Sequence, residues 1–203
     1  MLNACSIKKI NSTNQKGCNL LAQDLNSLNI DVAIVTETFL RPSIPDSFIT
    51  IPEYRLFRRD RVACHCRRSG CSKPHKGGGV IIYYRSSYHC DIYNSAEDVE
   101  FFWVKLSQPN SDHNHIFINA TYHPPNSDGK DLINYLTNST QSLFFNFPSS
   151  TILIGGDFNR LCLNEFLIQF CLADLDAAPT RGDAKLDLIL TNRPELIGST
   201  QVY

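Results

Sequence analysis

Polar side chains stand at the ends of several apolar segments of the chain. Glu37, Tyr122 and Asp157 each end or follow an apolar run, and Asn159 comes two residues after Asp157. A single Asp or Asn after a strand is typical of a turn. Several polar groups delivered together at strand ends are what an active site built on a rigid sheet requires.

These side chains suit hydrolysis of a phosphodiester bond. That reaction needs a cation on the phosphate, a base that orients water, and hydrogen-bond donors for the developing charge. Mg²⁺ takes oxygen ligands and often uses only one or two carboxylates, so Glu37 alone meets its demand. Asp157 could orient or deprotonate the water, while Asn3, Tyr122 and Asn159 could donate to phosphate oxygens.

Alternating apolar and helical patterns predict the elements that position these side chains. We expect helices over 16–28, 131–145 and 164–170, and strands over 31–35, 80–84, 100–106, 115–122, 151–154 and 186–190. Strands interleaved with helices favour a layered α/β fold over a pure β sandwich.

Length and composition indicate one globular domain that covers residues 1–203. The chain is 42% hydrophobic and 19% charged, and no apolar run approaches the roughly 20 residues of a membrane helix. Because no secretory signal begins the chain, we expect an intracellular monomer whose eight cysteines are mostly free thiols.

The net charge of −1 hides a strongly basic segment. Residues 55–85 hold nine basic side chains and only one acidic side chain, Asp60. Such a segment would attract phosphate, although a solvated basic loop explains the charge equally well. We expect a basic loop over 55–79 whose DNA contacts are Arg58, Arg59, Arg61, Arg67, Arg68, Lys73 and Lys76.

Cysteines and histidines cluster within the same segment. Cys64, His65, Cys66, Cys71 and His75 could hold zinc, but they lack a pair of two-residue knuckles, so the match is weak. A polar loop without metal is the alternative.

An ordered series of motifs resembles the endonuclease/exonuclease/phosphatase superfamily, and within it the apurinic-endonuclease-like domain of non-LTR retrotransposons. The series covers almost the whole chain and consists of Asn3, Thr36-Glu37-Thr38, Arg58-Arg59-Asp60-Arg61, Gly77-Gly78-Gly79-Val80, Glu100, Tyr122-His123-Pro124-Pro125, Gly156-Asp157-Phe158-Asn159 and Leu186-Asp187-Leu188-Ile189. The resemblance implies a four-layer α/β/β/α sandwich and nicking of DNA that depends on Mg²⁺ or Mn²⁺. In a full-length element it also implies a nuclear location and a reverse transcriptase domain that follows.

The resemblance also implies a role for each matching residue. Glu37 matches the metal-binding glutamate, and Asn3 matches an asparagine beside metal and phosphate. Tyr122 matches a phosphate contact. Asp157 matches the aspartate that aligns or activates water, with Asn159 as its partner at the phosphate. Asp187 matches the aspartate that orients a catalytic histidine.

The chain departs from the pattern at its last motif, a Ser-Asp-His strand. No histidine follows His123, and because neighbouring residues of a strand point to opposite faces, His123 should not share the site of Tyr122. We therefore expect a sandwich that lacks its final strand and part of its first, with poor or no nuclease activity. The alternatives are a non-catalytic DNA-binding remnant, and a phosphomonoesterase or phosphoinositide phosphatase on the same fold.

Overall fold

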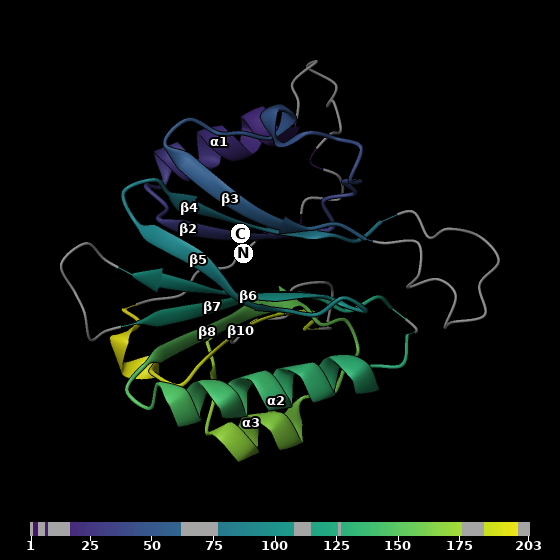
Figure 1. The fold of residues 1–203 in the computed structure, drawn as a ribbon, viewed down its shortest axis with the longest axis vertical. Coiled ribbons are helices and arrows are strands. Elements are labelled where there is room, and N and C mark those ends of the chain that lie inside the picture. Colours follow the sequence, from purple (N-terminus) through teal and green to yellow (C-terminus); the bar gives the residue numbers. More distant parts are fainter. Residues whose placement is uncertain are drawn as a thin grey trace.

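The computed structural model describes residues 2–3, 7, 17–61, 77–107, 115–125, 127–175 and 185–198. These residues form four layers, in which two packed β-sheets are covered by helices on their outer faces (Figure 1). The expected α/β/β/α sandwich is therefore confirmed. No helix in these described ranges is both long and apolar enough to span a membrane.

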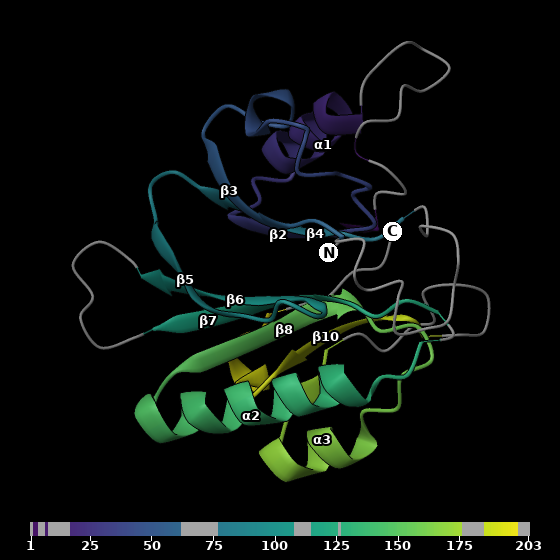
Figure 2. The ribbon, with the colours of Figure 1, turned by 45° about the vertical axis from the view of Figure 1, so that its right-hand side comes forward.

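The first sheet has four strands in the order β1-β2-β4-β3. Their bounds are Leu2–Asn3 for β1, Val32–Thr36 for β2, Val80–Arg85 for β4 and Tyr54–Arg59 for β3. The β1–β2 pair is parallel and the other two pairs are antiparallel. Helix α1 (Gly17–Ser27) lies on the outer face of this sheet (Figures 1 and 2).

The second sheet has six strands in the order β5-β6-β7-β8-β10-β9. Their bounds are His89–Ser95, Glu100–Ser107, Ile116–Tyr122, Thr151–Asp157, Asp187–Thr191 and Ala173–Asp174 in that order. Only the β7–β8 pair is parallel. Helices α2 (Lys130–Asn146) and α3 (Asn164–Phe170) cover its outer face (Figure 2). Two short 3₁₀ helices, Asp46–Phe48 and Pro194–Leu196, complete the described elements.

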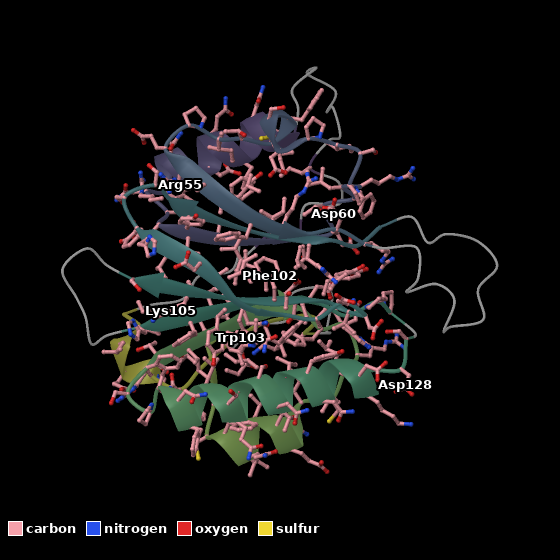
Figure 3. The ribbon with its side chains drawn as sticks, viewed as in Figure 1. Arg55, Asp60, Phe102, Trp103, Lys105 and Asp128 are labelled. Atoms are coloured by element: carbon pink, nitrogen blue, oxygen red, sulfur yellow. The ribbon has the colours of Figure 1, made fainter. Side chains whose placement is uncertain are left out.

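Alternation along the strands divides the apolar side chains among three cores. In β6, Phe102 points into the core between the sheets, whereas Trp103 points toward α2 (Figure 3). The indole Nε1 of Trp103 donates to Ser139 Oγ of α2 at 2.9 Å. Because both faces of the central strands are buried, these strands read as continuous apolar runs in the sequence.

The expected elements are confirmed apart from one- to three-residue shifts at their ends, but the basic segment needs correction. Its first part is not a loop, because Tyr54–Arg59 forms β3 at the edge of the four-stranded sheet. Charged side chains are common on edge strands, where one side of the strand meets solvent. Strand β5 was not predicted, because its sequence is mostly polar and exposed.

Candidate functional site

Four polar residues form one row across the six-stranded sheet. Glu100 pairs in register with Tyr122, Tyr122 pairs with Asp157, and Asp157 pairs with Asp187. Directly opposed residues of neighbouring strands point to the same face of a sheet. Because Tyr122 packs in the core between the sheets, the whole row faces the four-stranded sheet.

A second row faces it from the four-stranded sheet. Asn3 pairs with Thr36, Thr36 with Val80, and Val80 with Arg59. Val80 belongs to the core between the sheets, so Thr36 and Arg59, which pair with it in register, also face inward. For Asn3 the structure describes the backbone only, which places the residue beside the end of β2. Glu37 follows Thr36 directly and adopts a left-handed backbone conformation, with a φ of 53°.

A hydrogen bond joins the two sheets at this end of the sandwich. The Tyr122 hydroxyl donates to Glu37 Oε1 at 3.2 Å. Burial raises the pKa of Tyr122 well above its usual value, and the carboxylates of Glu37, Glu100 and Asp157 raise it further. Tyr122 therefore stays protonated near neutral pH and acts as a donor at the centre of an acidic cluster.

Asp157 and Asn159 are fixed by the turn that follows β8. Asp157 is 3% exposed, and its Oδ1 accepts a hydrogen bond from the backbone N–H of Asn159 at 3.1 Å. Asn159 has a φ of 50°, a conformation that asparagine tolerates better than most residues. Its Nδ2 donates to the carbonyl of His123 at 2.7 Å, so the turn is tied to the end of β7.

His123 helps to hold the turn after β8 and does not belong to the row of residues that contains Tyr122. Its Nε2 lies 2.9 Å from Ser127 Oγ in the turn before α2, and its backbone N–H donates to the carbonyl of Asp157 at 2.8 Å. Burial lowers the pKa of His123, although the nearby carbonyls of Phe158 and Ser127 oppose that shift. The imidazole is therefore mainly neutral at pH 7.

The predicted DNA contacts Arg58, Arg59 and Arg61 have different surroundings in the structure. Arg58 pairs with Asp46 at 3.1 Å and with Asp60 at 3.5 Å. Arg59 has the opposite orientation on β3 and faces the space between the sheets. Arg58 and Arg59 therefore lie on opposite faces of β3, because side chains alternate along a strand.

Arg61 lies next to the row of polar residues. Its Nε donates to Glu100 Oε1 at 2.6 Å, and its guanidinium carbon lies 5.3 Å from the centroid of the Tyr122 ring. The sequence pointed to Glu100 only through the motif series and gave no sign of this pairing. The remaining predicted DNA contacts, Arg67, Arg68, Lys73 and Lys76, lie outside the described residues, as does the cysteine and histidine cluster of 64–75.

Three glycines shape the loop behind Glu37. A Cβ on Gly79 would lie 2.5 Å from Thr38 Oγ1, and a Cβ on Gly78 would lie 2.6 Å from Arg61 Nε. The carbonyls of both glycines accept hydrogen bonds from the backbone of Thr38 and Phe39. The glycine run therefore lets the chain after Glu37 pack closely against the start of β4.

The donor set at this end of the sandwich fits a hard divalent cation. Glu37 and Asp157 offer carboxylate oxygens and Asn159 offers an amide oxygen, which are ligands that Mg²⁺ prefers. Within the described ranges, no three or more His, Cys, Asp or Glu side chains gather closely enough to hold an ion by themselves.

Comparison with known proteins gives structural likeness without sequence likeness. No family model and no curated protein matches the chain. The endonuclease domain of TRAS1, a telomere-specific non-LTR retrotransposon, is 15% identical with a TM-score of 0.59, and the match covers 88% of this chain and 80% of that domain.

Two further solved structures share the architecture. TDP2 of D. rerio, solved in complex with a single-strand DNA product, is 12% identical with a TM-score of 0.58, over 94% of this chain and 81% of that one. A protein of Bacteroides thetaiotaomicron, described as an endonuclease/exonuclease/phosphatase family protein, is 14% identical with a TM-score of 0.59, over 94% and 80%. At these identities the likeness establishes the shared fold.

Proposed function

Because this chain has the endonuclease/exonuclease/phosphatase fold, we propose that it is a divalent-metal-dependent endonuclease that nicks DNA. The observation that carries the proposal is the hydrogen bond from Tyr122 to Glu37. It brings a carboxylate suited to a metal and a neutral donor to the edge of the sandwich where Asp157 and Asp187 lie in register.

Each side chain then has a role that its surroundings support. The metal, when bound by Glu37 and assisted by Asn3, supplies positive charge to the phosphate. Asp157 is nearly buried and fixed by the turn to Asn159, so it is suited to orient and deprotonate a water molecule. Asn159 is neutral and its amide has a second N–H, so it can donate to a phosphate oxygen without adding negative charge. Tyr122 stays protonated, and its single hydroxyl proton would have to turn from Glu37 to the phosphate to act in the same way.

Asp187 has a less direct place in the proposal. It pairs in register with Asp157 from the neighbouring strand β10, so its carboxylate would add to the negative field that would hold a cation at this edge. The role that the resemblance implies for Asp187, orientation of a histidine, stays a prediction.

DNA is the substrate that charge favours. Nine of the 19 basic residues lie in 55–85, which also includes the end of β3 beside the site. Arg67, Arg68, Lys73 and Lys76 remain predicted backbone contacts of this segment, with Arg58 and Arg59 nearer the sheet. TRAS1 and the D. rerio TDP2 complex are examples of this fold in DNA chemistry.

A plasmid assay tests the proposal. Supercoiled plasmid and purified protein, with Mg²⁺, Mn²⁺ or EDTA, should give nicked circles only with metal. Asp157→Asn should lower the rate by about 10²- to 10⁴-fold, as expected for loss of a general base. Asp91→Asn, the same change at an exposed position on β5, should leave the rate unchanged. The proposal fails if wild-type protein at concentrations equal to the plasmid nicks no faster than Asp157→Asn.

Two further measurements identify the alternatives. Salt-dependent DNA binding without nicking is the result expected for a non-catalytic DNA-binding protein. Release of inorganic phosphate from a phosphomonoester or a phosphoinositide, with the plasmid intact, is the result expected for a phosphatase.

A further inference from the structure

The guanidinium of Arg61 is enclosed by three separate parts of the fold. Its Nε and Nη2 donate to the two carboxylate oxygens of Glu100 at 2.6 Å and 3.4 Å. Its guanidinium carbon lies 5.3 Å from the centroid of the Tyr122 ring, within the usual range of a cation–π contact. Gly78, in the segment before β4, lies against the guanidinium of Arg61. The group is held by β6, β7 and the segment before β4.

Glu100 requires this partner because its side chain is only 2% exposed. A buried carboxylate without a partner is strongly disfavoured. Glu100 pairs in register with Tyr122, whose hydroxyl contacts Glu37. Without Arg61, Glu100 would lose this ion pair, and the negative charge near Glu37 and Asp157, where an anionic phosphate must approach, would be less well compensated.

We propose that Arg61 is a positioning residue for the site, an inference that rests on the proposed function for its consequence on nicking. The guanidinium fixes the face of the Tyr122 ring, which keeps the hydroxyl on Glu37, and it cancels the charge of Glu100. Arg61 acts through Tyr122 and Glu100 and does not itself need to touch the phosphate. This differs from the DNA contact that its place in a basic segment suggested.

Gly78 is part of the same arrangement. Its φ is 81°, and a Cβ there would lie 2.6 Å from Nε and 2.7 Å from Cζ of Arg61. An alanine at this position would push the guanidinium away from Glu100 while leaving the charge in the protein. Gly78→Ala should therefore reproduce the effects of Arg61→Gln on Tyr122 in a milder form.

The first test observes Tyr122 directly and does not depend on catalysis. In protein carrying ¹³Cζ-tyrosine, the Tyr122 signal is assigned by its loss in Tyr122→Phe. Arg61→Gln and Gly78→Ala should shift that signal, because its ring contact and the position of its hydroxyl change. The signal of Tyr83, which is also buried and donates to the carbonyl of Ile49 at 2.8 Å, should stay in place.

The second test is a double-mutant cycle on the nicking rate. Arg61→Gln should reduce the rate about tenfold in wild-type protein and by a smaller factor in Tyr122→Phe, where only its effect on the charge of Glu100 is left, because contacting residues that act together are not additive. Arg61→Gln with Glu100→Gln should recover part of the lost rate, because the buried carboxylate that lost its ion pair with Arg61 is then gone. If Arg61→Gln protein does not fold, Arg61→Lys, which keeps the charge, is measured in its place.

The outcomes separate the two proposals. If wild-type protein does not nick, the proposed function fails, and the tyrosine signals still decide whether Arg61 positions Tyr122. An unchanged Tyr122 signal in folded Arg61→Gln or Arg61→Lys protein overturns the inference. The inference is also overturned if Arg61→Gln lowers the nicking rate of Tyr122→Phe protein by the same factor as it lowers the rate of wild-type protein.

Discussion

Two adjacent glycines of β8 should respond very differently to the same added methyl group. A Cβ on Gly156 would lie 2.1 Å from the carbonyl oxygen of Thr121, its register partner on β7. Neither backbone can move away without breaking the pairing of these strands. We expect Gly156→Ala to lower the free energy of unfolding by about 3 kcal/mol or more, at the upper end of overpacking costs.

Gly155 faces the other sheet, and its obstacle is a side-chain end. A Cβ there would lie 2.5 Å from Cδ1 of Ile34 on β2, and the next nearest atom is 3.7 Å away. Gly155→Ala should therefore cost only about 1–2 kcal/mol, because Ile34 can adjust. Ile34→Val removes the colliding atom at a cost of about 0.5–1.5 kcal/mol. The double variant should be about 1 kcal/mol more stable than the sum of the single changes predicts.

Urea unfolding followed by the fluorescence of Trp103, the chain's one tryptophan, measures these differences. Gly198→Ala is the control, since no described atom lies within 4 Å of the added Cβ. It should leave stability unchanged or raise it by less than about 1 kcal/mol. The reasoning is refuted if Gly156→Ala is no less stable than Gly155→Ala. It is also refuted if Ile34→Val does not reduce the loss of stability that Gly155→Ala causes.

Two further predictions concern titration and reactivity. Burial lowers the pKa of His123 below its usual value, so the unfolded chain binds this proton more readily and stability should fall as the pH drops below about 6.5. Urea midpoints at pH 7.5 and 5.5 should differ less in His123→Gln than in wild-type protein; equal differences in the two proteins would contradict this. Burial raises the pKa of the Cys90 thiol to about 12, and Asp91 adds to the shift. Iodoacetamide at pH 8 should therefore label the exposed Cys162, but label Cys90 only after unfolding; peptide mass spectrometry that finds equal rates would refute this.

The sequence predicted well those elements whose residues are buried on both faces. The runs 80–84 and 152–154 are apolar throughout because helices or the other sheet cover each side. Strand β3 was missed because Arg55, Arg58 and Arg59 look like parts of a basic loop, whereas an edge strand accommodates them.

The sequence also predicted only part of the candidate site. The position of polar residues at strand ends predicted that Glu37 and Tyr122 would lie together, and the structure places them in contact. Their roles in chemistry remain predictions. The ion pair between Arg61 and Glu100 joins residues 39 positions apart, and no local pattern reveals such a pairing, because it depends on how the two sheets pack.

The hydrogen bond between Glu37 and Tyr122 joins residues 85 positions apart, which has a consequence for how the protein acquires its site. Contacts between distant segments form slowly, because a long loop must close first. On the ribosome, Glu37 and Tyr122 emerge well before Asp157 and Asp187, so a nascent chain that ends at β7 has only half of the row. We expect the acidic edge of the sandwich to be assembled late in folding, and neither half of the chain alone to contain it.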